Sequence, residues 1–172
     1  MKQTFIFILT VLSVCAFAQV AIGKDSVTNN SVSLEFGTGS KGIVLPWVTS
    51  SAGVSGVVDG TIIYDITDHK VKYRKLGSWF DLSVDKNGAA DTTLQDTQTE
   101  NPSAKTAIGA NGATDATPGI LVLTDSDKAM VLPKVANPHL MIKNPASGMM
   151  VYDTANRQLA VFNGAVWTFW KP

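Results

Sequence analysis

The last third of this sequence repeats a stretch from near its start. Residues 60–65, Gly-Thr-Ile-Ile-Tyr-Asp, recur as residues 148–153, Gly-Met-Met-Val-Tyr-Asp, and Trp79 recurs as Trp167. The tyrosine and the tryptophan are 15 positions apart in both copies, and the offset between copies stays between 86 and 88 along roughly sixty residues. A near-constant offset of this kind indicates one structural unit that is used twice.

Residues 1–18 are typical of a secretory signal peptide. Residues 5–14 form an apolar run, and the segment 16–18, Ala-Phe-Ala, has the small-x-small pattern of a cleavage site. We expect cleavage before Gln19 and a secreted, periplasmic or outer-cell-surface location. The alternative is lipid attachment at Cys15. No later run approaches the ~20 apolar residues that a transmembrane helix needs, so none is expected in the mature chain.

The composition limits the possible partners. Cys15 is the only cysteine, so a chain that begins at Gln19 has no disulfide and must gain its stability from core burial or chain pairing. Basic and acidic residues balance at 14 each, and no Lys/Arg run stands out. The pattern therefore disfavours nucleic acid and anionic membrane surfaces as partners.

The repeat divides the chain into four segments. They are the signal peptide 1–18, a first β-module 19–83, a linker 84–105 and a second β-module 106–172. The linker is rich in Asp, Thr, Gln, Asn and Ala and nearly lacks large apolar residues, so it is predicted to be mobile or extended. The alternative is a segment that is ordered by packing along a neighbouring chain.

Each module is predicted to contain a three-stranded antiparallel meander. Short apolar runs follow a glycine, Asp-led turns come next, and aromatic residues end the last strand. Asn163-Gly164 is a strong turn dipeptide, and Leu76-Gly77 occupies the matching place. The predicted fold is therefore all-β, with two tandem antiparallel meander modules joined by a polar linker. Units of this size are marginal alone and leave unpaired edges, so we expect them to pair within or between chains.

The second copy resembles a module of secreted Bacteroidetes proteins. That module has the pattern Lys-Gly-Phe-Leu-Pro-Pro-Arg, then Gly-x-x-Val-Tyr-Asn, then Asn-Gly-x-x-Trp. Residues 129–135, 144–154 and 162–167 follow it, and residues 41–46 follow it in the first copy. The hairpin half is also similar to repeats in trimeric phage tail fibres. In both copies the second proline of the pattern is replaced. The resemblance implies a β-rich surface module without specifying a ligand.

No motif in the sequence supports catalysis or a bound cofactor, so we expect no enzymatic activity and no cofactor. Residues 37–42 match Gly-x-Gly-x-x-Gly, but an extended stretch that ends at Pro46 follows, where a dinucleotide site needs a helix. His69 and His139 lack a His or Cys partner at ligand spacing, which disfavours zinc.

Short-spaced acidic residues raise the question of calcium. Asp65 with Asp68, and Asp153 with Asn156, offer oxygen ligands, but neither pair follows the calcium-loop pattern. Side chains that bond back to their own turns explain Asp65 and Asp153 without a metal. We therefore expect no metal site, with calcium kept as the alternative.

The tryptophans are the main candidates for partner or ligand contacts. Trp79 and Trp167 are equivalent, so they are expected to close the core of each module. Trp47 and Trp170 have no tryptophan counterpart and, with Phe169, are the candidates for binding a ligand or partner. The residues expected to maintain the repeated structure are Pro46, Pro133, Tyr64, Tyr152, Trp79 and Trp167.

Together these features favour an exported, non-enzymatic surface protein that acts in adhesion or as a structural subunit of a cell-surface complex or filament. Its partner is expected to be itself or another surface protein, through the apolar end at residues 166–170. The alternative is a carbohydrate-binding module in which exposed tryptophans contact a glycan.

Overall fold

The computed structural model describes residues 19–101 and 103–171, which form fourteen short strands, one 3-10 turn and one short α-helix. The signal-peptide prediction for residues 1–18 lies outside the described residues. In chain order the elements are β1 (Val20–Ile22), β2 (Val32–Phe36), β3 (Ile43–Val44), β4 (Trp47–Val48), η1 (Ser51–Gly53), β5 (Ile62–Asp65), β6 (Lys70–Lys75), β7 (Ser78–Asp81), β8 (Thr106–Ile108), β9 (Leu121–Leu123), β10 (Ala129–Val131), β11 (Lys134–Val135), α2 (Pro138–Met141), β12 (Met149–Asp153), β13 (Gln158–Phe162) and β14 (Trp167–Trp170).

The repeat seen in the sequence is also a repeat of structure. Strands β1 to β7 of the first copy are followed by β8 to β14 in the same order, at the offset that the sequence shows. Even the helical element recurs, because η1 lies between β4 and β5 and α2 lies between β11 and β12. We refer to residues 19–83 and 106–171 as the first and second copy.

The strands are wound as a β-solenoid of about 8 turns and do not form two separate meander modules. In four places a strand pairs in parallel with the next strand along the chain: β1 with β2, β4 with β5, β8 with β9, and β11 with β12. A parallel pair requires the chain to return to the same end before it pairs, which gives the winding. The predicted all-β class is therefore confirmed, with one short helix among the described residues.

Each copy does contain a local antiparallel group at its C-terminal end. Strands β5, β6 and β7 pair in sequence, as do β12, β13 and β14. The tight turns fall where the sequence predicts them, at Leu76-Gly77 with φ of 50° and 73°, and at Gly164 with φ of 100°. Glycine adopts such positive φ values without the steric cost of a Cβ atom.

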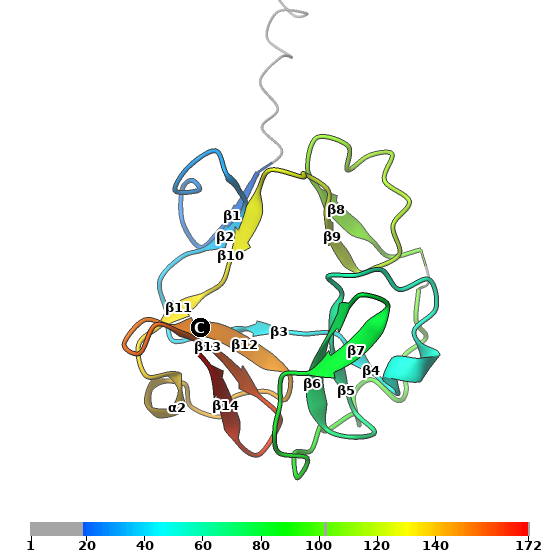
Figure 1. The fold of residues 1–172 in the computed structure, drawn as a ribbon, viewed down its shortest axis with the longest axis vertical. Helices are drawn as coiled ribbons and strands as arrows, with labels where there is room; N and C mark the ends of the chain where they lie inside the picture. The colour runs from blue at the N-terminus through cyan, green and yellow to red at the C-terminus, as the bar shows by residue number, and fades with distance from the viewer. Residues whose placement is uncertain (1–18, 102, 172) are drawn as a thin grey trace, which may run out of the picture.

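The two copies exchange strands, which corrects the prediction of two tandem meander modules and agrees with the expectation that the units pair within or between chains. Strand β3 of the first copy pairs antiparallel with β12 of the second, and β10 of the second copy pairs parallel with β2 of the first. Figure 1 shows the resulting sheets arranged around the middle of the molecule, with β3 running across to β12. The physical reason is the thin core of each copy, because units of this size bury too little surface alone.

The core consists of two clusters, and only one of them is shared. The shared cluster joins Leu45, Tyr64 and Val71 of the first copy to Met150 and Val161 of the second. The other cluster belongs wholly to the second copy, and its buried members are Val135, Ile142, Met149, Val151, Ala160 and Phe162. The second copy therefore has a buried cluster of its own, whereas Leu45, Tyr64 and Val71 of the first copy pack in the shared cluster.

The polar segment between the copies packs against the second copy. The Asn163 side-chain amide donates to Asp85 O at 2.8 Å, and the Ser147 hydroxyl donates to Ala89 O. A Cβ atom at Gly88 would lie 1.7 Å from Asn163 O, so this approach requires glycine. The described residues between Asp91 and Thr106 are largely exposed. The boundaries 84 and 105 remain predictions.

Candidate functional site

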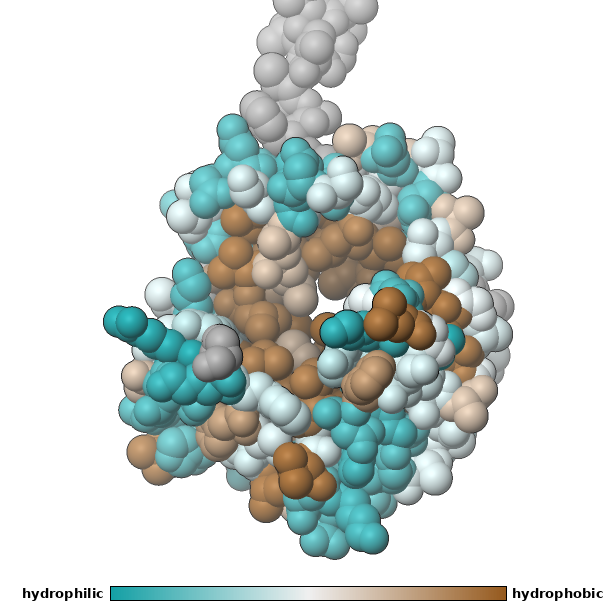
Figure 2. All heavy atoms as spheres, in the orientation of Figure 1, coloured by the Kyte–Doolittle hydropathy of each residue, from teal (hydrophilic) through white to brown (hydrophobic). Residues whose placement is uncertain are grey.

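An apolar cavity of about 640 Å³ lies between the two antiparallel groups. Figure 2 shows a hollow in the middle of this face with hydrophobic residues around it. Its lining comes from both copies and includes Ile62, Tyr73 and Phe80 of the first copy and Met130, Leu132, Met150, Leu159 and Trp170 of the second. A cavity of this size and lining is suited to an apolar or aromatic partner group.

Aromatic side chains with exposed surface form part of the cavity wall. Tyr73 and Phe80 stack with ring centroids 5.5 Å apart and an interplanar angle of 28°. Trp170 and Phe80 are each 43 % exposed, and the Trp170 Nε1–H donates to Leu82 O. The hydrogen bond holds the indole in place while one part of the ring stays accessible. Large exposed aromatics beside an apolar hollow are typical of contact surfaces.

Sequence analysis missed most of these lining residues. Ile62, Tyr73 and Met130 belong to short apolar runs that the sequence assigns only to strands, and their common cavity depends on how the copies pack. Trp170, in the apolar end at residues 166–170, is the one lining residue that the sequence singled out as a contact candidate.

The three predicted contact residues lie in three different surroundings. Trp170 lines the cavity. Its neighbour Phe169 instead meets the His139 ring edge-on, with centroids 5.7 Å apart, because successive strand residues point to opposite faces. Trp47 lies at the joint between the copies, where its Nε1–H donates to Ser147 O at 2.8 Å and its ring is 6.3 Å from that of Tyr64.

The predicted repeat residues Pro46, Pro133, Tyr64 and Tyr152 make matching contacts. Tyr64 N donates to Pro46 O and Tyr152 N donates to Pro133 O, both at 2.9 Å. The side chains differ, because Tyr64 is fully buried and its hydroxyl donates to Asn163 O at 2.7 Å, whereas Tyr152 is half-buried. Tyr64 thus ties the first copy to the turn of the second.

Trp79 and Trp167 occupy equivalent positions in their strands but have different neighbours. Trp167 packs against the second copy's own cluster, with its ring 5.3 Å from that of Phe162. Trp79 lies 5.6 Å from the Arg74 guanidinium carbon, in cation–π geometry. Of these two tryptophans, only Trp167 therefore packs against a buried hydrophobic cluster.

The two repeated aspartates both fix turns. Asp65 accepts from Thr67 N at 3.0 Å and Ser51 N at 2.7 Å. Asp153 accepts from Ala155 N and Asn137 N, each at 3.0 Å. The predicted turn role of both carboxylates is confirmed by these bonds.

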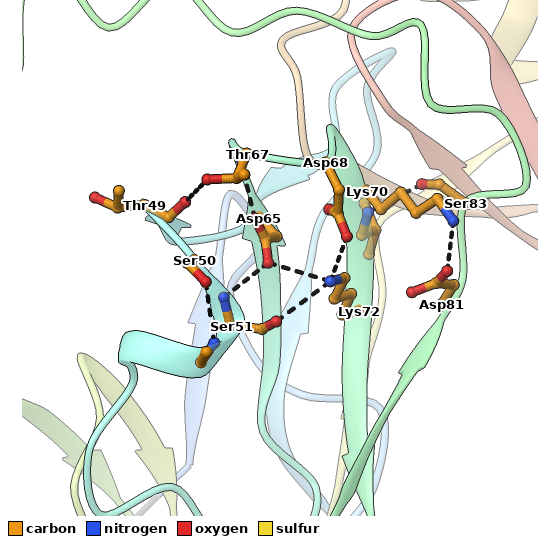
Figure 3. A network of polar contacts seen from close by, with 12 residues as sticks. Thr49, Ser50, Ser51, Asp65, Thr67, Asp68, Lys70, Lys72, Asp81 and Ser83 are labelled. Carbon is orange, nitrogen blue, oxygen red and sulfur yellow. Dashed lines mark hydrogen bonds and ion pairs between the residues drawn. The ribbon is translucent and has the colours of Figure 1, made fainter.

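A network of charges surrounds Asp65 in the first copy. Lys72 Nζ lies 3.1 Å from Asp65 Oδ2 and 2.5 Å from an oxygen of Asp68, and it also donates to the Ser51 hydroxyl (Figure 3). Burial alone lowers the pKa of Lys72, but the Asp68 and Asp65 carboxylates outweigh it and the pKa is raised. Both side chains of the Asp65–Lys72 pair are buried, which by itself disfavours charge, but the ion pairs and hydrogen bonds outweigh this effect, so the pKa of Asp65 is lowered and that of Lys72 is raised.

The second copy holds its aspartate without a lysine. Burial by itself raises the pKa of Asp153, but hydrogen bonds from the Asn156 side chain, the Asn137 amide and the Gln158 side chain lower it to about 2. Asp153 is fully buried, and hydrogen-bond donors converge on both of its oxygens. Its role is structural, because its donors come from the turn that follows it, from Gln158 at the start of β13 and from Asn137 just before α2.

The other motifs from the sequence do not converge on a reactive centre. Residues 37–42 lead into strand β3. Within residues 19–101 and 103–171, no three His, Cys, Asp or Glu side chains group as metal ligands. No helix in that part of the chain is long and apolar enough to cross a membrane.

Residues 96–171 match a family model described as phage tail like trimerisation region. The match covers the second copy and the end of the polar segment, which is less than half of the 172 residues. No curated protein and no solved structure matches the chain. The matched segment contains Met130, Met150 and Trp170 of the cavity wall.

Proposed function

We propose that this chain is an exported, non-enzymatic structural subunit that self-associates into a fibre-like assembly at the cell surface. The observation that carries the proposal is the similarity of residues 96–171 to a trimerisation region. An apolar cavity with exposed aromatics, built partly from the same residues, supports it. Export to the cell surface rests on the signal-peptide pattern of residues 1–18.

The cavity wall has the chemistry of an interface. Interface centres are enriched in Trp, Tyr, Phe and Met and depleted of charge, and the wall contains Trp170, Tyr73, Phe80, Met130 and Met150. Trp170 is the best candidate for an anchor, because tryptophan dominates interface hot spots and its indole is already held by Leu82 O.

Analytical ultracentrifugation of the wild type tests the assembly. We expect a stable oligomer at micromolar concentration and a shift to smaller species in Trp170→Ser. Phe169→Ser is the matched control, because Phe169 lies in the same strand but meets His139 on the other face. It is expected to lower stability in circular dichroism without dissociating the oligomer. A wild type that stays monomeric at high micromolar concentration contradicts the proposal.

A second candidate function is carbohydrate binding at the same aromatic wall. The stacked Tyr73 and Phe80 rings beside Trp170 favour it, because sugar rings pack against aromatic faces. A glycan array supports this function if binding is lost in Phe80→Ala while the sedimentation of the protein is unchanged. Absence of any glycan signal from the wild type removes it.

A further inference from the structure

The first strand of each antiparallel group has one edge that is only partly covered by its own copy. In the second copy, β11 pairs with the C-terminal end of β12, at Tyr152 and Asp153. In the first copy, β4 pairs with the C-terminal end of β5 in the same way, at Tyr64 and Asp65. Both pairings stop there and leave the N-terminal end of the strand without a partner from its own β4 or β11.

Proline explains why the pairing stops at the same place twice. Tyr64 N donates to Pro46 O and Tyr152 N donates to Pro133 O, and these are the first bonds of each parallel pair. A proline has no N–H, so it cannot donate to the next carbonyl along the neighbouring strand. Amide groups of residues two apart point to the same edge of a strand, so Ile62 presents its N–H and C=O to the edge that Tyr64 uses.

The second copy fills this edge with a strand from the other copy. Strand β3 pairs antiparallel with β12, so that Met150 lies opposite Ile43 and Met149 opposite Val44. Leu45 N also donates to Gly148 O at 3.1 Å. One edge of β12 is therefore shared by two strands, β11 and β3.

The first copy leaves the equivalent edge open. Among the described strands, β5 pairs only with β4 and β6, and no strand takes the place that β3 takes on β12. The surroundings of the glycines before the two strands also differ. A Cβ atom at Gly148 would lie 2.8 Å from Tyr64 Cβ, whereas at the equivalent Gly60 nothing lies within 4 Å.

The chain also contains an unused donor strand of matching sequence. Met130 and Val131 are the repeat equivalents of Ile43 and Val44, at the offset of 87 that relates Pro46 to Pro133. Strand β10, which contains them, is the edge strand of its sheet and pairs only with β2 among the described strands. No described strand pairs with its second edge.

We propose that the open edge of β5 accepts β10 of a second molecule of this chain, as β12 accepts β3 within one molecule. The repeat gives the register. Strand β10 of the second molecule runs antiparallel to β5 of the first, with Val131 opposite Thr61 and Met130 opposite Ile62. The inference rests on the proposed self-association and assigns it a specific strand addition, in which backbone bonds supply affinity. In one chain the cavity separates Ile62 from Met130, both of which line it.

Donor and acceptor are different segments of the chain, so the contact is heterologous. A heterologous contact either closes into a ring or continues as a filament. Both outcomes agree with a fibre-like assembly, and a ring of three molecules agrees with the matched family model. Strand addition also removes two exposed sheet edges, which otherwise promote unspecific pairing.

Site-directed disulfides test the register directly. Because Leu45 and Gly148 form a hydrogen-bonded pair, Val44 and Met149 form a non-hydrogen-bonded pair, with Cα atoms about 4.5 Å apart. Thr61 and Val131 take the equivalent places in the proposed contact, within the Cα separation that a disulfide requires. All variants carry Cys15→Ser, which removes the only native cysteine.

Differently tagged Thr61→Cys and Val131→Cys chains are mixed and oxidised. We expect a disulfide-linked heterodimer from the mixture and covalent oligomers from the double variant. The matched control replaces Thr61→Cys with Ile62→Cys, whose side chain points to the opposite face and is expected to cross-link poorly. Circular dichroism checks that each variant is folded.

The outcomes separate this inference from the proposed function. Heterodimers formed at Thr61 and Val131 but not at Ile62 and Val131 support it. A double variant that cross-links only within one chain shows that the chain closes its own edge, which overturns it. Oligomers in the ultracentrifuge without the heterodimer also overturn it and leave self-association standing through another surface. A wild type that is only monomeric overturns both.

Discussion

The same face of the central strand of the antiparallel group is charged in the first copy and uncharged in the second. Strands β6 and β13 are equivalent, and on this face the positions Lys70, Lys72 and Arg74 correspond to Gln158, Ala160 and Phe162. In the second copy, Ala160 and Phe162 belong to the cluster that includes Val135 and Ile142, next to α2. One backbone pattern is thus stabilised by burial in one copy and by charge pairing in the other.

The tryptophans show the same difference one strand further. Trp167 packs against Phe162, whereas Trp79 lies over Arg74, the residue equivalent to Phe162. Both tryptophans are half-buried, but of the two only Trp167 packs on a buried apolar side chain, so we expect it to contribute more than the cation–π contact of Trp79, which is worth about 0.5–2 kcal/mol. The comparison teaches that the first copy relies on the shared cluster, while the second copy also has a core of its own.

Separating the copies is expected to give the largest effect. A fragment 19–83 is expected to lack β-structure in circular dichroism, because Leu45, Tyr64 and Val71 lose their partners Met150 and Val161. A fragment 84–172 is expected to keep its β signal but to unfold at lower temperature than the whole chain, because its own cluster stays complete. A first-copy fragment that folds alone would contradict this dependence.

The buried ion pair gives the next largest effect. We expect Lys72→Ala to lower the free energy of unfolding by about 2–3 kcal/mol, because Asp65 then stays buried without its counter-ion. Lys70→Ala is the matched control, since its partner Asp81 is exposed and such pairs are worth about 0–1 kcal/mol. Urea denaturation measures the free energy of unfolding of both variants. Equal losses would show that the Asp65–Lys72 pair contributes no more than an exposed ion pair.

Acid is expected to weaken the second copy through Asp153. Its pKa in the folded protein is about 2, below the ordinary value of 3.8, so its contribution is complete above about pH 4 and is lost as the pH falls towards 2. We expect thermal melts of the wild type to show falling stability across this window. Asp153→Asn should be less stable at neutral pH and show a shallower decline. An unchanged slope would assign the acid sensitivity to other carboxylates, with Glu35 as the first candidate because hydrogen bonds from Thr28 and Lys24 lower its pKa to about 2 as well.

Local features of the sequence predicted local features of the structure. The repeat, the antiparallel groups, the Asn163-Gly164 turn and the Asp-led turns each depend on residues that are close along the chain. The glycine, proline and aspartate patterns that specify them act through backbone geometry and short-range hydrogen bonds. These are the parts of the fold that a single sequence constrains.

The exchange of strands between copies was not predictable in the same way. Ile43-Val44 and Met130-Val131 are nearly the same sequence at equivalent positions, yet β3 pairs with β12 and β10 pairs with β2. A pattern that is the same in both copies cannot specify different partners, so the choice comes from the packing of the whole chain. The cavity wall depends on that packing, which is why only Trp170 of its residues was a candidate from the sequence.

The smallest expected difference concerns Gly42, just before β3, and its repeat equivalent Ala129, the first residue of β10. A Cβ atom at Gly42 would lie 2.6 Å from Met149 Cγ and 2.7 Å from Val151 Cγ1, so Gly42→Ala forces these side chains to shift. We expect a loss of about 1–2 kcal/mol, typical of a slightly overpacked core. Ala129 is exposed, so Ala129→Gly is expected to cost only about 0.5–1 kcal/mol through backbone entropy. Urea denaturation of both variants measures the comparison. Equal losses would show that β3 and β10 meet equally crowded neighbours, which would contradict the difference between a filled edge on β12 and an open one on β5.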